Sequence, residues 1–176
     1  MSSQNLILDT NIIQYITDDF VSKELIPYLL TLRDKGYTEN ISTVSVFESI
    51  KGLKRVDEPK LLGFIAAFPK YEVDERVLTA AARLHNLYNQ DKSVPSDGIS
   101  SEDKIIAATA IITNSFVLTA NINDFPRPYF NEIEKEKLIY QNKKQKDVML
   151  CVEVLQPDFE YLKSVLIEHG YLEEGN

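Results

Sequence analysis

Short apolar runs alternate along this chain with longer stretches in which apolar residues recur every three or four positions. The first apolar run, residues 6–8, ends abruptly at the polar triplet Asp9-Thr10-Asn11, and a helical pattern over residues 12–16 follows at once. An apolar run this short, bounded in this way, predicts a buried parallel strand that leads directly into a helix.

The same alternation continues to the end of the chain. Apolar spacing and capping residues predict helices over residues 20–35, 44–55, 58–68 and 158–169 and after Asp74 and Ser100, with strands over residues 40–44, 71–73, 115–119 and 148–155. Strands that alternate with helices imply right-handed crossovers. We therefore expect an α/β fold in three layers, with a mainly parallel sheet flanked by helices.

Length and composition favour one soluble domain. The 176 residues contain no low-complexity linker, so we expect a single domain over residues 1–176. The lone Cys151 lies inside an apolar run and is expected to pack in the core, as in a reducing compartment. No basic leader precedes residue 9 and no apolar run reaches membrane-spanning length, so we expect a cytoplasmic protein without membrane contact.

The formal net charge of −8 argues against a protein that grips nucleic acid through a generally basic surface. It does not exclude a nuclease, because some of the acidic side chains can be metal ligands whose charge a bound cation reverses.

Four acidic residues, Asp9, Glu48, Asp103 and Asp124, each lie where the predicted chain changes from one element to the next. Ligand sites in parallel sheets form outside the carboxyl ends of the strands, so these side chains are candidates for one common site. Each also has a purely structural interpretation. These are helix capping for Asp9, an exposed pair with Lys51 for Glu48, a capping box with Ser100 for Asp103 and a turn for Asp124.

Taken together and in order, the four segments resemble the PIN-domain ribonucleases, and most closely the VapC toxins of VapBC toxin–antitoxin modules. The motifs that carry the resemblance are Leu8-Asp9-Thr10-Asn11, Ser45-x-x-Glu48, Asp103-x-x-Ile106-Ala107-Ala108-Thr109-Ala110 and Leu118-Thr119-x-Asn121-x-x-Asp124-Phe125. They cover a core of about residues 5–126, which leaves residues 127–176 as a C-terminal extension of a strand and a helix.

The resemblance implies a metal-dependent endoribonuclease that hydrolyses RNA. Asp9, Glu48, Asp103 and Asp124 would hold one or two Mg²⁺ or Mn²⁺ ions, and the neighbouring polar side chains Thr10, Asn11, Thr119 and Asn121 would orient them. The chemistry of the residues agrees, because hard cations prefer oxygen ligands and supply an activated water, so that no side-chain nucleophile is required. The two histidines, His85 and His169, have no matched partners for general acid–base catalysis.

The chain departs from the toxins it resembles by continuing well beyond Phe125. Residues 127–146 carry six Lys or Arg against three Glu. They are interpreted either as a solvated loop or helix or as a contact to the RNA backbone, with Arg127 as the first candidate residue. The basic residues Lys51, Lys54 and Arg55 after Glu48 are candidates for the same contact.

A toxin of this kind implies two protein partners, a small antitoxin that covers the acidic pocket and a second copy of the toxin. Apolar residues beside the pocket, Ile12, Ile13, Tyr15 and Ile16, would suit an interface, but such residues more often belong to the core. Two alternatives stay open, a stand-alone RNA-processing nuclease of the same fold and a PIN-like scaffold that binds without catalysis. A phosphatase of the haloacid-dehalogenase type is disfavoured, because Asn11 stands where that family has a second Asp.

Overall fold

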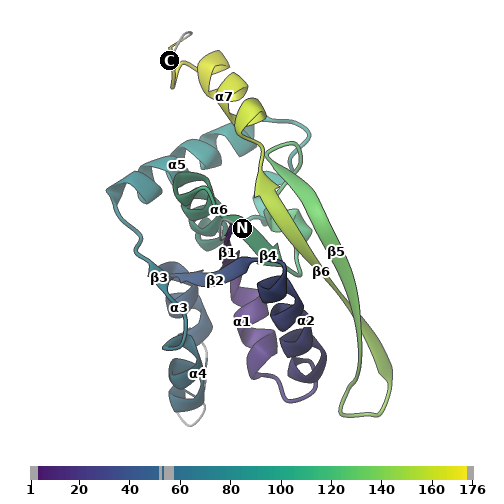
Figure 1. The fold of residues 1–176 in the computed structure, drawn as a ribbon. Coiled ribbons are helices and arrows are strands. Elements are labelled where there is room, and N and C mark those ends of the chain that lie inside the picture. The colour runs from purple at the N-terminus through teal and green to yellow at the C-terminus, as the bar shows by residue number, and fades with distance from the viewer. Residues whose placement is uncertain (1–3, 52, 54–57, 174–176) are drawn as a thin grey trace.

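The computed structural model describes residues 4–51, 53 and 58–173, and its centre is a six-stranded sheet (Figure 1). The strands lie in the order β3 (Lys70–Tyr71), β2 (Tyr37–Ser42), β1 (Gln4–Leu8), β4 (Phe116–Thr119), β6 (Asp147–Pro157) and β5 (Phe130–Gln141). The first four strands are parallel to one another, whereas β6 runs antiparallel to both β4 and β5. The sheet is therefore a parallel unit with an antiparallel hairpin added at one side.

Helices cover both faces of this sheet. They are α1 (Thr10–Thr17), α2 (Ser22–Asp34), α3 (Thr43–Ile50), α4 (Glu58–Ile65), α5 (Glu75–Gln90), α6 (Ser101–Thr113) and α7 (Phe159–Glu168), with short 3₁₀ turns at Ser96–Gly98 and Ile122–Asp124. On one face Leu6, Leu8 and Leu118 pack with buried residues of α1, α2 and α4. On the other, Ile7 and Val117 pack with α5, α6 and α7. The predicted fold class, a mainly parallel sheet flanked by helices, is confirmed.

The side chains of the central strand β1 are buried on both faces of the sheet. Leu6, Ile7 and Leu8 are completely buried, as expected for a strand with a helical layer on either side. The strand ends at Asp9, whose carboxylate accepts a hydrogen bond from the backbone N–H of Thr10 and caps α1. The first polar residue after the strand therefore also starts the first helix.

The interpretation of residues 127–146 as a solvated loop or helix is wrong, because most of this segment forms strand β5. The extension is thus a long hairpin followed by α7. The pattern was hidden because β5 is the outermost strand, so most of its side chains face solvent, and five of its 12 residues are charged. Natural edge strands often carry such charges, which discourage pairing with other chains.

Strand β2 begins at Tyr37, three residues before the predicted start at residue 40. The discrepancy comes from Glu39, which is buried although it is charged. Its carboxylate accepts hydrogen bonds from Arg33 Nε at 2.7 and 2.8 Å, so the charge is paired inside the strand.

The apolar residues of α1 belong to the core. Ile12 and Ile13 are fully buried and Ile16 nearly so, and they therefore offer no surface to a partner. Within the part of the chain that the structure describes, no helix combines the length and apolar character needed to cross a membrane.

Asn114 provides a test of how α6 leads into β4. It ends the helix in the left-handed conformation, with φ 49° and ψ 50°. Asn114→Ala should lower the free energy of unfolding by about 1 kcal/mol, because a Cβ-bearing residue without a local polar contact is strained there. Asn114→Gly is the matched control and should unfold at the same or a higher urea concentration. Equal loss in both variants would contradict the backbone explanation.

Candidate metal centre

Asp9 is the most enclosed of the four acidic residues, with an exposed fraction of 1%. The hydroxyl of Thr119 donates to Oδ2 at 2.7 Å, and the side-chain amide of Asn11 donates to the same oxygen. The backbone N–H of Thr10 donates to Oδ1 at 2.7 Å. Both carboxylate oxygens therefore have donors, which favour the ionised form in a position where burial opposes it.

The donors to Asp9 are themselves held by the chain after β4. Asn11 Oδ1 accepts from the backbone N–H of Ala120 at 3.0 Å, and Thr119 Oγ1 accepts from the backbone N–H of Asn121 at 2.9 Å. These bonds join the carboxyl ends of β1 and β4, the two central parallel strands.

Glu48 lies on α3 and reaches the same edge of the sheet. Its Oε2 accepts a hydrogen bond from the hydroxyl of Thr10 at 2.6 Å. The ion pair that Lys51 forms is with Glu102, at 3.4 Å, so the exposed pair of Glu48 with Lys51 that the sequence suggested is wrong. Glu48 instead faces the residues around Asp9.

Asp103 starts α6 and takes part in a capping box. Its Oδ2 accepts from the backbone N–H of Ser100 at 3.0 Å and from the Ser100 hydroxyl at 2.6 Å, while Ser100 Oγ accepts from the backbone N–H of Asp103 at 3.0 Å. The structural interpretation of Asp103 is thus confirmed. It does not exclude a second role, because only one carboxylate oxygen is used in this way.

Asp124 ends the 3₁₀ turn after β4 and is half-buried. The side-chain amide of Asn121 donates to its Oδ2 at 2.7 Å. Asn121 therefore orients Asp124 while its backbone contacts Thr119, so one short segment connects two of the acidic positions.

The electrostatics show that the four carboxylates share one environment. Burial first, and then the charges of Asp103 and Asp124, raise the pKa of Asp9 to about 7. Burial and the charges of Asp103 and Glu48 raise the pKa of Asp124 to about 6. Burial is also the main reason that the pKa of Glu48 is raised, with a further contribution from Asp103. The charge of Asp103 therefore opposes the ionisation of the other three carboxylates.

The carboxylates are near one another without yet forming a coordination shell. Among the described residues, no group of three or more His, Cys, Asp or Glu side chains stands close enough to hold a metal ion. Asp103 and Asp124 each direct one oxygen to a neighbouring donor, which is Ser100 for Asp103 and Asn121 for Asp124. The side chains at this edge would suit a hard divalent cation, because all of the candidate ligands are oxygens and several are anionic.

A cleft of about 650 Å³ opens beside Asp124. One wall is formed by residues 94, 95 and 97–99, and the other by Asn121, Asn123 and Asp124. The acidic edge of the sheet is therefore accessible from solvent and has room for a ligand.

Of the four basic residues predicted to contact RNA, the structure describes two, and both form ion pairs. Lys51 pairs with Glu102, and Arg127 pairs with Glu132 at 2.9 Å, although both cations are more than half exposed. Lys54 and Arg55 lie outside the described residues.

Sequence reasoning missed Glu153, a buried acid beside this edge. It pairs with Thr119 across β4 and β6, it is 5% exposed, and its Oε1 accepts from Lys135 Nζ at 2.5 Å. Its second oxygen is buried without a hydrogen-bond partner in the described residues. A single Glu within the apolar run of residues 148–155 was the available signal.

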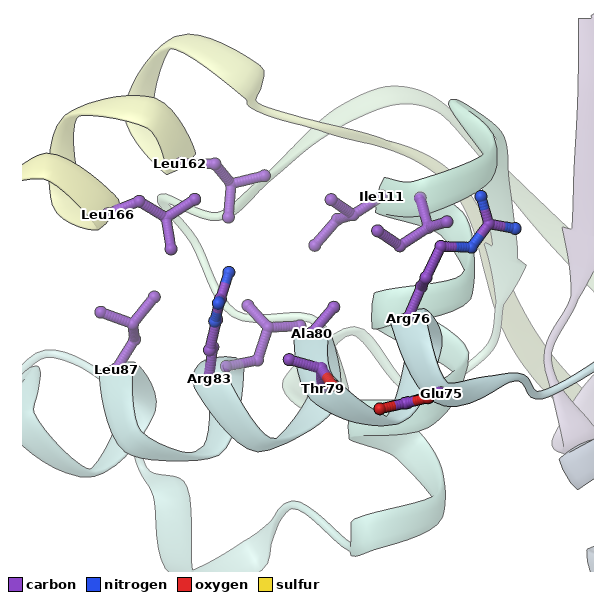
Figure 2. A pocket seen from close by; sticks show the side chains of 11 residues that line it. Glu75, Arg76, Thr79, Ala80, Arg83, Leu87, Ile111, Leu162 and Leu166 are labelled. Atoms are coloured by element: carbon purple, nitrogen blue, oxygen red, sulfur yellow. The ribbon is translucent and has the colours of Figure 1, made fainter. Parts of the chain in front are cut away.

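A second concavity lies elsewhere. An apolar groove of about 470 Å³ runs between α5, α6 and α7, with Leu162, Leu166 and Ile111 on its walls and Arg83 pointing into it (Figure 2). Its lining shares no residue with the acidic edge of the sheet.

The chain was compared with models of known protein families. The family model described as the PIN domain matches residues 6–131. No curated protein is significantly similar to the chain.

Two solved structures share the fold. The crystal structure of VapBC2 from Rickettsia felis, bound to a DNA fragment from its promoter, matches with a TM-score of 0.55 and 22% identity, over 69% of this chain and 91% of that one. A toxin–antitoxin complex from Klebsiella pneumoniae matches with a TM-score of 0.53 and 21% identity, over 70% and 92% of the two chains.

The raised pKa of Asp9 predicts how the metal-free protein responds to pH. Between about pH 4 and pH 7 the folded state holds a proton on Asp9 that the unfolded state has already lost, so stability should fall as the pH rises through this window. Melting temperatures measured across it in EDTA should decline less steeply for Asp9→Asn than for the unsubstituted protein. Parallel declines would show that Asp9 ionises normally in the folded state.

Proposed function

Because the chain belongs to the PIN domain family, we propose that it is a metal-dependent endoribonuclease whose Mg²⁺ or Mn²⁺ ions are held by Asp9, Glu48, Asp103 and Asp124. The observation that carries this proposal is the mutual effect of the four carboxylates. They come from four separate elements, yet the charge of Asp103 raises the pKa of each of the other three, and Asp124 and Glu48 add to this at Asp9 and Asp124 respectively. Such shared perturbation is typical of functional sites.

The surrounding polar residues have positioning roles in this proposal. Thr119 and Asn11 fix Asp9, Thr10 orients Glu48, and Asn121 orients Asp124. Side chains held by such hydrogen bonds present their oxygens in fixed directions. When bound, a divalent ion would activate a water molecule for attack on phosphorus and neutralise charge on the phosphate.

The cleft beside Asp124 is the proposed place for the scissile phosphodiester. It lies next to the acidic edge and is open to solvent, so a flexible single strand can enter it. The acidic residues around it would repel a phosphate on their own, and we therefore expect RNA binding at the centre to depend on the metal.

A toxin function is supported by the two solved structures of the same fold, which are toxin–antitoxin complexes. By analogy, the partners of this chain would be a small antitoxin that covers the acidic cleft and a second copy of the chain, acting in the cytoplasm. A stand-alone RNA-processing nuclease is the second candidate. It is favoured by the hairpin and α7, which extend past the residues that the family model matches.

A scaffold without catalysis is the weaker alternative. All four acidic positions carry carboxylates, and their supporting donors are in place. Loss of activity would therefore need a cause outside the metal centre.

Cleavage of a mixed structured RNA pool tests the nuclease directly. We expect cutting with Mg²⁺ or Mn²⁺, none with EDTA, and a loss of at least about 100-fold in Asp9→Asn, because removing a metal ligand removes the activated water. Gel analysis of the products is sufficient. Cutting that survives in Asp9→Asn would point to a contaminating nuclease.

The response of thermal stability to Mn²⁺ tests the ligand role of Asp103. In Asp103→Asn the metal-free protein should be as stable as the unsubstituted protein or more so, because repulsion with Asp9 and Asp124 is relieved and Asn can still accept from Ser100. The rise in melting temperature on adding Mn²⁺, worth about 2.7 kcal/mol at 100-fold the Kd, should be lost. Glu102→Gln, one residue earlier, is the matched control and should keep it. A full Mn²⁺ response in Asp103→Asn would make this residue only a cap.

A further inference from the structure

The hairpin of β5 and β6 extends well past the edge of the sheet at which the metal centre lies. The last residue of β4, Thr119, pairs with Glu153, but β6 and β5 continue to the Gln141–Asp147 pair. At ~3.4 Å per residue, this part projects roughly 20 Å beyond the end of β4. Figure 1 shows it running alongside α2 and away from the other strands. The projecting part leaves from the same edge as Asp9.

One face of the projecting hairpin is fixed to the rest of the molecule. Leu138 and Val152 are buried in the core cluster that includes α2, with Tyr140 packed against it. At the base, Glu134 accepts from the hydroxyl of Tyr28 at 3.3 Å and pairs with Lys35 at 2.6 Å. The hairpin is therefore an anchored arm and not a free loop.

The opposite face of the hairpin is open. Its side chains lie in line with Thr119, which is next to the metal centre. Directly paired residues share a face, so Thr119, Glu153 and Lys135 lie side by side across β4, β6 and β5. Thr119 is also the residue that donates to Asp9. Farther along the same face come Lys137 and then the Ile139–Met149 pair, which is 63% and 58% exposed.

The charges on the hairpin separate into a paired base and an unpaired outer part. Near the base, Lys135 pairs with Glu153 and Arg127 with Glu132. Within the part of the chain that the structure describes, no acidic group lies within ion-pair distance of the outer lysines, which are Lys137, Lys143, Lys144 and Lys146. On a protein of net charge −8, this is a local reversal of sign.

Hydrogen bonds order the backbone of the turn from which the lysines at the tip extend. Asn142 Oδ1 accepts from the backbone N–H groups of Lys144 at 2.9 Å and Lys146 at 3.2 Å, and the Asn142 N–H donates to the Lys146 carbonyl at 3.0 Å. The cations are thus presented at the end of an ordered arm.

We propose that the outer, lysine-bearing part of the β5–β6 hairpin binds the sugar–phosphate backbone of single-stranded RNA at nucleotides outside those held at the metal centre. The inference rests on the proposed nuclease function, and it adds a second contact region that this chain's extension supplies. Lysines without acidic partners neutralise phosphates and release counterions, and exposed Ile139 and Met149 offer an apolar surface to bases. Because the lysine-bearing face is continuous with Thr119, an RNA strand that leaves the metal centre can follow this face of the hairpin without interruption.

Binding measured in the Asp9→Asn background, in which the RNA stays intact, tests the arm. The probes are fluorescein-labelled single-stranded RNAs of ~4 and ~20 nucleotides, since only the longer one can span both regions. In the tip variant K143Q/K144Q/K146Q, affinity for the longer RNA should fall about tenfold, and the slope of log K against log salt should become shallower by about 2. Affinity for the short RNA should not change.

A matched control removes the same charge elsewhere. K60Q/K92Q/K163Q should bind both RNAs as the parent does. Equal affinity of the tip variant and its parent for the longer RNA would overturn the proposal, as would an equal loss on both RNAs. A tip variant that binds RNA normally but no longer binds poly-glutamate would also overturn it, in favour of an acidic protein partner. Cleavage by the unsubstituted protein is measured separately. Failure of the proposed nuclease function and failure of the proposed RNA contact by the hairpin therefore give different results.

Discussion

The burial of the Asp9 carboxylate between the two central parallel strands is the constraint on which the rest of the structure depends. A charge that is 1% exposed is costly unless donors surround it. The donors here are Thr10, Asn11 and Thr119, and supplying them fixes the start of α1 against the end of β4. The same bonds position Asn121 and, through it, Asp124. The fold and the site are therefore established by one set of contacts.

A second constraint opposes the first, because like charges gathered at one edge destabilise the fold that gathers them. The structure moderates this in two ways. The pKa values of Asp9 and Asp124 are raised, so part of the charge is suppressed near neutral pH. Asp103 meanwhile satisfies its carboxylate at the start of α6.

Much of the fold was predictable from sequence because buried parallel strands and amphipathic helices have different periods. The run before Asp9 and the apolar spacing of α5 and α6 were sufficient to predict the parallel sheet and the edge at which the acidic residues lie. Strand β5 was not predictable in this way, since an outer strand shows charges where an inner strand shows apolar residues.

Pairing between distant strands was also beyond sequence reasoning. Nothing in the sequence near Glu153 indicates that it lies beside Thr119, because the register between β4 and β6 depends on the whole hairpin. Asp103 shows a different limit. Its capping box could be predicted from Ser100-x-x-Asp103, but its closeness to Asp9 and Glu48 depends on how α6 and α3 pack. Local patterns predict local contacts, and the site consists mainly of distant ones.

The bond from Thr119 to Asp9 joins residues 110 positions apart, and it has a consequence for the order of events during synthesis. Strand β1, which Asp9 directly follows, is synthesised early in translation. The residues of β4 that pair with it emerge only after more than a hundred further residues. Contacts of such sequence separation form late in folding, because the chain between them must first be closed. A growing chain therefore carries its first carboxylate without the others. For the nuclease proposed above, this delay would separate the period in which the chain is attached to the ribosome from the period in which it is active.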